Sequence, residues 1–196
     1  MDQRINVLET MLDKMTGQLA ALDPRQDDQP TPCPSMTVGD LAEHLAVWMQ
    51  VFAATTNDTP LDIDPLTHRV GPDRADVFAA AAAETVGGLR RSGHDRLMTM
   101  HGDQLPGELV LNMLLMEYVG HGWDLARATR SPLPYTEAEA TVALDAAQAI
   151  IQPDYRGPEL FDAEVAVASG APAIDRLVGF LGRDPAWSAP MTVCEV

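Results

Sequence analysis

Cysteine, lysine and long apolar runs are all scarce in this sequence. The two cysteines, Cys33 and Cys194, are too few for a disulfide-stabilised scaffold or for a metal site built from cysteine alone. The longest apolar stretch, residues 109–123, is interrupted by polar side chains, so no membrane-spanning helix is expected. The first 15 residues lack the basic and apolar regions of a signal peptide. These absences predict a soluble, cytoplasmic protein.

Basic side chains are also few relative to acidic ones. The chain has 13 Lys and Arg against 29 Asp and Glu, a net charge of −16. Such a surface repels phosphate backbones and anionic lipid, so we expect neither nucleic acid nor membrane as a partner. The 196 residues, 46% of them hydrophobic, suffice for one domain with a real core. The oligomeric state stays open, a homodimer included.

Helical periodicity dominates the chain. Apolar residues spaced three and four apart, with capping and breaking residues between them, predict four long helices. These are residues 4–22, 37–54, 74–91 and 108–129, followed by shorter helices at 136–151 and 173–181. Residues 96–101 allow one small strand or extended segment. We expect an all-α protein, a four-helix bundle over residues 1–152 with a C-terminal extension over 153–196 packing on it.

The helix predicted at 108–129 carries the chemical signal. It is apolar on nearly every side, which predicts a place in the centre of the fold. Its polar exceptions include Glu117, His121 and Asp124, which fall within about 60° of one another around the helix. A buried carboxylate without a partner would cost several kcal/mol, so Glu117 must have one.

Glu117 and His121, at positions i and i+4, project side by side and can reach one ion. His44, on the inward stripe of the second helix, is a third donor. Two imidazoles and one carboxylate are the ligand set of catalytic zinc sites with an open fourth position, and also of non-haem iron sites. A plain Glu–His ion pair with a hydrogen-bonded core histidine is the competing interpretation.

The remaining histidines are weaker candidates for the metal site. His68, in a loop, and His94, beside a glycine, are expected to be solvated. His101, at the end of the extended segment, is a minor candidate for approaching the site. Cys33 is expected to be a packed side chain and Cys194 an exposed one, and neither is predicted to be a nucleophile.

Three charged residues have competing interpretations. Asp124 is expected either to accept a hydrogen bond from a metal ligand, orienting it, or to bond a neighbouring helix end. Asp40 is most simply part of a capping box with Thr37. Arg127, about 240° around the helix from His121, is expected to form a surface salt bridge. No separate general base is predicted, so no catalytic residue is proposed beyond the metal centre.

Two sequence blocks and the C-terminal ending resemble a known family. TPCPSMTVGDLAEHL (residues 31–45) resembles the opening block of the actinobacterial mycothiol-dependent maleylpyruvate isomerase N-terminal family, part of the DinB-like metalloenzyme superfamily. EYVGHGWDLARAT (117–129) resembles that family's block around its last metal-binding histidine. AIDRLVGFLGRDPAW (173–187) is similar to the ending of short, single-domain members.

The resemblance implies a DinB-like four-helix bundle holding a divalent metal through His44, Glu117 and His121. Zinc is the first expectation, with nickel or iron as alternatives. Family members use a low-molecular-weight thiol, such as mycothiol, whose sulfur the metal activates. In the isomerase, thiolate addition to a cis double bond would allow rotation, and elimination would return the trans isomer.

This sequence departs from the family pattern in places. Met36 replaces a usual Trp, Arg130 stands where Gly commonly ends the helix, and the 45 or so residues after the fifth helix are too few for the isomerase's second domain. The leading hypothesis is a metal-dependent thiol S-transferase or isomerase acting on a small electrophile. The alternatives are a non-catalytic metal-binding or sensing protein of the same fold and an interaction module without metal.

Overall fold

The structure, a computed structural model, describes residues 2–157 and 161–190. It is mainly helical with one small antiparallel sheet, which confirms the predicted fold class. The helices are α1 Gln3–Ala20, α2 Val38–Asn57, α3 Arg74–Ser92, α4 Gly107–Thr129, α5 Glu137–Ile150 and α6 Ala173–Phe180. Short 3-10 turns are η1 Pro24–Gln26, η2 Gly71–Asp73 and η3 Pro153–Tyr155. Cys194 lies outside the described residues.

The helix ends follow from capping chemistry. At the start of α2 the backbone N–H of Asp40 donates to Thr37 Oγ1 at 3.2 Å, and the N–H of Thr37 donates to Asp40 Oδ2 at 3.1 Å. This reciprocal pair satisfies two backbone donors that the first turn of a helix leaves free, and it confirms the predicted capping box. At its other end α2 continues three residues beyond the prediction, to Asn57, and stops where Asp58 turns left-handed with φ 51°.

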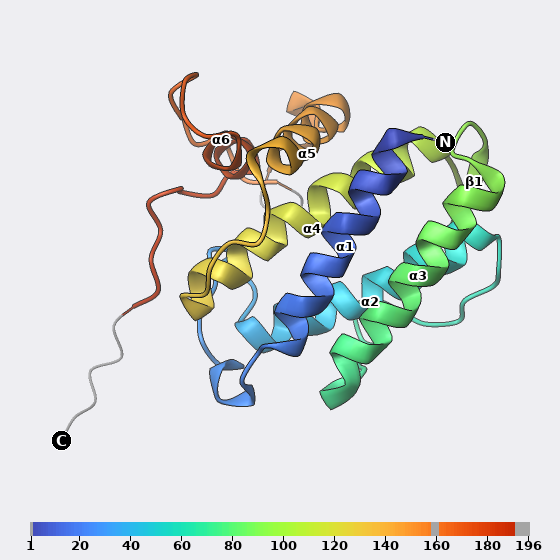
Figure 1. The fold of residues 1–196 in the computed structure, drawn as a ribbon, viewed down its shortest axis with the longest axis horizontal. Helices are drawn as coiled ribbons and strands as arrows, with labels where there is room; N and C mark the ends of the chain where they lie inside the picture. Colours follow the sequence, from blue (N-terminus) through green and yellow to red (C-terminus); the bar gives the residue numbers. More distant parts are fainter. Residues whose placement is uncertain (1, 158–160, 191–196) are drawn as a thin grey trace.

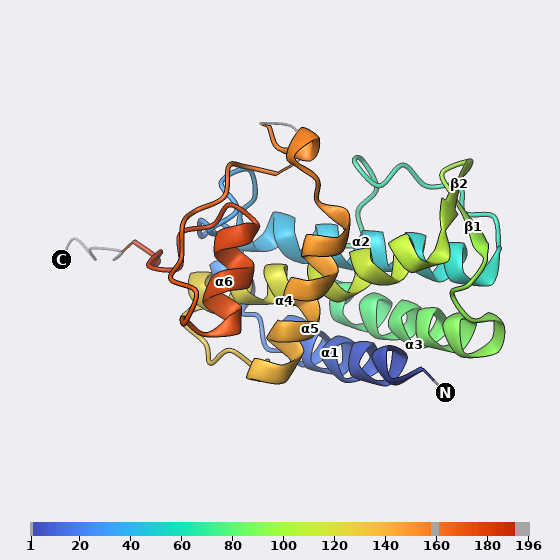
Figure 2. The ribbon, with the colours of Figure 1, turned by 90° about the horizontal axis from the view of Figure 1, so that it is seen from above.

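The four long helices close into a bundle (Figure 1). α1 packs against α3 and α4, and α2 packs against the same two helices, so each long helix has two neighbours in the bundle. α5 adds a third neighbour to α4, and α6 packs on α5. Figure 2 shows α4 between α2 on one side and α1 on the other. This central position explains why α4 is apolar almost all round.

The chain's one lysine ties α1 to α5. Lys14 Nζ lies 2.6 Å from Glu139 Oε2, and the same carboxylate oxygen accepts from the N–H of Thr136 at the start of α5. The backbone amide and the ammonium together neutralise a mostly buried carboxylate. Glu139 therefore caps α5 and docks it on the bundle at once.

A two-stranded hairpin precedes α4. β1 (Leu97–Met100) pairs with β2 (Asp103–Pro106) in antiparallel register, where the sequence predicted at most one extended segment. The two residues between the strands, His101 and Gly102, have φ values of 50° and 89°. A tight two-residue hairpin turn requires two consecutive positive φ values. The turn at His101 and Gly102 therefore connects two paired strands, where the sequence predicted a single extended segment.

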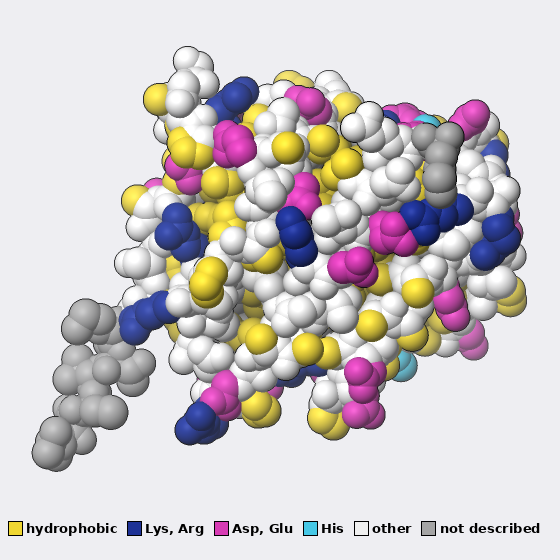
Figure 3. Space-filling model, in the orientation of Figure 1, with side chains coloured by type: hydrophobic (Ala, Val, Ile, Leu, Met, Phe, Trp, Pro, Cys, Tyr) yellow, Lys and Arg dark blue, Asp and Glu magenta, His cyan; other side chains and the backbone are white. Residues whose placement is uncertain are grey.

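Acidic and basic side chains are both spread over the face drawn in Figure 3, with apolar side chains between them. Across the described ranges, no helix has both the length and the apolarity to cross a membrane.

Candidate metal centre

Two neighbouring helices supply the side chains of the site. His44 lies in the first half of α2, and Glu117 and His121 lie one turn apart on α4. Because α2 packs against α4, the inward face of one helix meets the Glu–His face of the other. One donor atom from each of the three residues lies within 4.8 Å of the other two, so the group can hold a metal ion.

One carboxylate oxygen sits between the two imidazoles. Glu117 Oε1 lies 2.9 Å from His44 Nε2 and 3.4 Å from His121 Nε2. The ring centroids of His44 and His121 are 5.3 Å apart, and their planes are inclined by 71°. Both Nε2 atoms therefore face the same point from different directions, as they do when two histidines share an ion.

The site is only partly closed. The side chains of His44 and Glu117 are each 23% exposed, and that of His121 is 11% exposed. All three side chains therefore keep some contact with solvent. No Cys, Asp or further His among the described residues joins the three-residue cluster.

Asp124 contacts the far nitrogen of His121. Its Oδ2 lies 2.9 Å from His121 Nδ1, and its side chain is fully buried. The ionised Asp124 carboxylate can only accept, so His121 Nδ1 donates a hydrogen bond to it, and Nε2 is the nitrogen that faces Glu117. Of the two interpretations of Asp124, the structure thus places it on the histidine and not on a helix end.

Charge coupling perturbs the pKa values of these groups. Burial lowers the pKa of His121, but the Glu117 carboxylate and the hydrogen bond to Asp124 outweigh burial and raise it to about 10. Burial raises the pKa of the Glu117 carboxyl, but His121 and His44 hold it well below its usual range. Without a metal ion, His121 and Glu117 form a partly exposed ion pair at neutral pH.

Arg183 contacts Asp124 and His121, and sequence reasoning missed it. Its Nη2 lies 3.0 Å from Asp124 Oδ2 and 3.4 Å from His121 Nδ1. The signal available in the sequence was Asp124 itself, because a carboxylate on a buried helix needs a cationic partner as well as a histidine. The partner, Arg183, follows α6 and is 59 residues away from Asp124 in the sequence, so no local pattern pairs the two residues.

The sequence matches the family described as the mycothiol maleylpyruvate isomerase N-terminal domain over residues 8–126. That match covers more than half of the chain. The chain belongs to this family. His44, Glu117, His121 and Asp124 fall inside the matched residues, whereas Arg183 falls outside them.

Similar proteins occur in two strains of Mycobacterium tuberculosis. Each is an uncharacterized protein, 29% identical to this chain over 175 residues, an overlap of 87% of this chain and 92% of the relative. No solved structure matches this member of the family.

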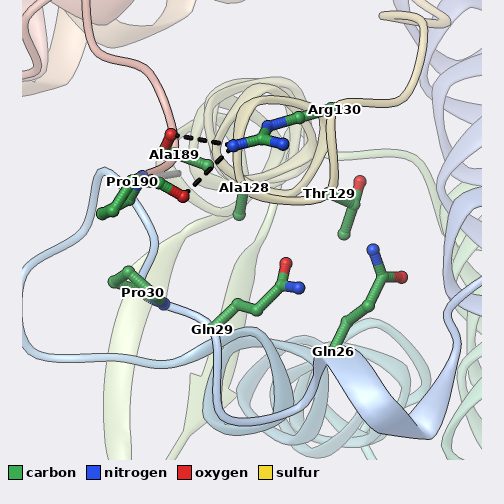
Figure 4. Close-up of a pocket in the computed structure, with 8 residues that line it drawn as sticks. All are labelled: Gln26, Gln29, Pro30, Ala128, Thr129, Arg130, Ala189 and Pro190. Atoms are coloured by element: carbon green, nitrogen blue, oxygen red, sulfur yellow. Dashed lines mark hydrogen bonds between the residues drawn. The ribbon is translucent and has the colours of Figure 1, made fainter. Parts of the chain in front are cut away.

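One departure from the family's sequence pattern has a structural explanation. Arg130 follows α4 in the left-handed conformation, with φ 56°, at the position where glycine is favoured because it has no side chain to clash. Its guanidinium donates to the backbone oxygens of Ala189 and Pro190 at 3.2 and 3.1 Å (Figure 4). Arg130 thus ends the helix and holds the C-terminal segment against it.

A pocket of about 210 Å³ lies beside Arg130 and is lined by none of His44, Glu117 and His121. Figure 4 shows its walls, which are Gln26, Gln29, Pro30, Ala128, Thr129, Arg130, Ala189 and Pro190. The lining has no carboxylate, histidine or cysteine, which are the donor types of the candidate metal centre.

The other predicted candidates do not join the three-residue cluster. His101 packs edge-on against Trp48, with ring centroids 5.7 Å apart, and Trp48 in turn lies 6.2 Å from the His44 ring. His68 is half-buried in the loop between α2 and α3. Cys33, also half-buried, is a free cysteine.

Two expectations were wrong. His94 is not solvated, because its Nε2 lies 2.5 Å from Asp2 Oδ2 and its Nδ1 lies 3.0 Å from Glu108 Oε2. Arg127 forms no salt bridge with any described residue. It stacks on the Trp123 ring at 5.3 Å, because the tryptophan one turn earlier on α4 offers it an aromatic face.

Proposed function

We propose that this protein holds a divalent metal ion at His44, Glu117 and His121 and uses it in the thiol-dependent S-transfer or isomerisation of a small electrophile. The co-substrate is a low-molecular-weight thiol of the mycothiol type, in keeping with the family. The observation that carries the proposal is the convergence of the three donor atoms between α2 and α4. Zinc is the metal we favour, with nickel or iron as alternatives.

The donor set fits such an ion. Ligand atoms about 2.1 Å from a tetrahedral zinc ion are roughly 3.4 Å from one another. The two Nε2-to-Oε1 distances, 2.9 and 3.4 Å, are close to this value before any adjustment. Imidazole and carboxylate are also the donors that zinc takes in catalytic sites with three protein ligands.

The chain's own residues prepare the donor atoms. Asp124 accepts a hydrogen bond from His121 Nδ1 and so leaves Nε2 as the nitrogen that binds the ion, once the ion has displaced the Nε2 proton. Glu117 supplies the one negative charge of the ligand set, so a divalent ion bound there keeps a net positive charge. Such an ion lowers the pKa of a bound thiol, so that thiolate predominates at neutral pH.

The partial exposure of His44 and Glu117 gives the thiol sulfur a direction of approach. Trp48, whose ring is tilted by 48° from that of His44, and His101, edge-on to Trp48, form a row of aromatic rings beside His44, and we take this row as one wall of the approach. An electrophile lying against this wall would be held next to the sulfur, where proximity alone accelerates addition.

The test combines metal content with turnover. Protein purified without added metal or an affinity chelate is analysed for its elements, then loaded with zinc and mixed with mycothiol and a panel of electrophiles. We expect about one ion per chain and thiol-dependent consumption of at least one electrophile, both lost in His121→Ala and kept in His68→Ala. A loaded protein that consumes none of them would favour the non-catalytic metal-binding or sensing role, and absence of bound metal would rule out both.

A further inference from the structure

The segment after α6 returns to the metal centre. Gly182, with φ 86°, turns the chain at the end of α6, and Arg183 then points back at α4. Its guanidinium meets Asp124 with two nitrogens, Nη2 at 3.0 Å from Oδ2 and Nε at 3.4 Å from Oδ1. A forked pair of this kind fixes the plane of the carboxylate as well as its place.

We propose that Arg183 is a positioning residue for the metal site, acting on His121 through Asp124. The proposal rests on the proposed function, because it assumes that His121 is a metal ligand. It adds a residue from outside the span that matches the family, and it couples the C-terminal extension to the centre of the bundle.

One carboxylate oxygen of Asp124 accepts hydrogen bonds from both His121 and Arg183. Oδ2 of Asp124 lies 2.9 Å from His121 Nδ1 and 3.0 Å from Arg183 Nη2. An oxygen held by a guanidinium cannot swing away from the imidazole, so the ring keeps its orientation and its Nε2 keeps facing Glu117. Arg183 is itself anchored, because its Nη1 donates to the backbone oxygen of Leu181 at 3.0 Å.

The burial and charge of Asp124 explain why a cation is needed to hold it against His121. The Asp124 side chain is fully buried, and a buried carboxylate facing only a neutral imidazole would lack a counter-charge. When His121 gives its Nε2 lone pair to a metal, Arg183 remains the cation beside Asp124. The arginine thereby keeps Asp124 ionised as the acceptor of the Nδ1 proton.

The decisive comparison is between two arginines that hold the same segment. Arg156 donates to the backbone oxygens of Asp162 and Phe180, both at 3.0 Å, and lies 4.7 Å over the Phe180 ring. It secures the C-terminal extension without any contact to Asp124. Arg156→Met is therefore a matched control for Arg183→Met, since both remove a guanidinium that anchors the segment.

The experiment measures zinc affinity of the full chain by competition with a chelator, and the visible absorption spectrum after loading with cobalt(II). We expect Arg183→Met to lower zinc affinity by about 10- to 100-fold and to shift the cobalt bands. Arg156→Met should stay within twofold of the parent with the parent's spectrum, even if its melting temperature falls. Arg183→Lys keeps the charge but not the fork, so it should fold and lose affinity by an intermediate factor.

A double variant tests whether Arg183 acts on His121 through Asp124. In the Asp124→Asn background, adding Arg183→Met should change zinc affinity by less than twofold, because the carboxylate that relays the effect is gone. Parent-like affinity in both Arg183 variants, an equal loss in Arg156→Met, or additive losses in the double variant would each overturn the positioning role alone. A parent protein that binds neither ion would overturn the proposed function together with it.

Discussion

His121 Nδ1 lies 2.9 Å from Asp124 Oδ2, three residues further along the same helix. The i, i+3 spacing brings the two side chains onto one face of α4, where both are shielded from water. The contact holds the Nδ1 proton against Asp124 and turns Nε2 toward Glu117. A short local spacing on one buried helix therefore settles which nitrogen of His121 is available to a metal ion.

Replacing His121 with alanine should remove bound metal and thiol-dependent activity together. Stability should also fall, by about 2 kcal/mol, because Asp124 loses a charge-assisted hydrogen bond and Glu117 loses its ion pair with His121. The loss is limited because Glu117 keeps His44 and Asp124 keeps Arg183. Elemental analysis, turnover and chemical unfolding on the parent and the variant measure all three quantities.

His68→Ala is the control for this prediction. His68 lies in the loop between α2 and α3, outside the cluster, so metal content and stability should match those of the parent. Equal metal content in the parent and His121→Ala would contradict the assignment of His121 as a ligand.

The sequence predicted those parts of the fold and site that depend on local spacing. Periodicity located the long helices because their apolar stripes are continuous, and the i, i+4 spacing of Glu117 and His121 placed them on one face of α4. The inward stripe of α2 brought His44 toward them. The structure shows that the three donor atoms converge, while their role as metal ligands stays a prediction.

Contacts made at long range could not be predicted in this way. Arg183 reaches Asp124 across 59 residues, and His94 reaches Asp2 across 92, so no local pattern pairs them. The second hairpin strand was missed for another reason. Residues 103–106 have no alternating apolar pattern, and their strand exists because it pairs with β1.

Metal binding should strengthen as pH rises. The pKa of His121 is raised to about 10 in the metal-free protein, so below that pH the ion must displace a proton from Nε2. Zinc affinity is expected to rise by up to about tenfold per pH unit between pH 6 and 8, one proton being released. Calorimetry in two buffers of different ionisation enthalpy counts that proton directly, and a pH-independent affinity would contradict the prediction.

The free energy of unfolding of the metal-free protein should fall as the pH rises. The pKa of His121 is raised from about 6.5 in the unfolded chain to about 10 in the fold, so the folded state binds the extra proton. The stabilisation of the fold by protonated His121 is fully present below pH 6.5 and is lost as the pH rises toward 10. Between pH 7 and 9 the free energy of unfolding should fall by at most about 1.4 kcal/mol per pH unit, the slope for one proton.

Denaturant unfolding of chelator-treated protein across this pH range measures the slope. His121→Ala should show a shallower dependence because it lacks the titrating group. A parent and a variant with the same slope would mean that His121 does not hold an extra proton in the fold.

Gly122 should tolerate no side chain, although it lies in the middle of a helix. A Cβ there would come within 2.5 Å of Tyr135 Cε2 and 2.8 Å of Gln18 Oε1. Tyr135 has little room to retreat, because its hydroxyl donates to the backbone oxygen of Tyr118 at 2.9 Å. Gly122→Ala is therefore expected to destabilise the protein by about 1–3 kcal/mol through overpacking between α4 and the segment before α5.

Gly17→Ala is the matched control, a helical glycine with nothing within 4 Å of the position its Cβ would take. Alanine there removes the entropy cost of a helical glycine and should stabilise the fold by about 0.5–1 kcal/mol. The two substitutions add the same methyl group to two helices, so chemical unfolding should give opposite signs. If Gly122→Ala were as stable as Gly17→Ala, Tyr135 and Gln18 would not pack on α4 as described, since those contacts distinguish the two positions.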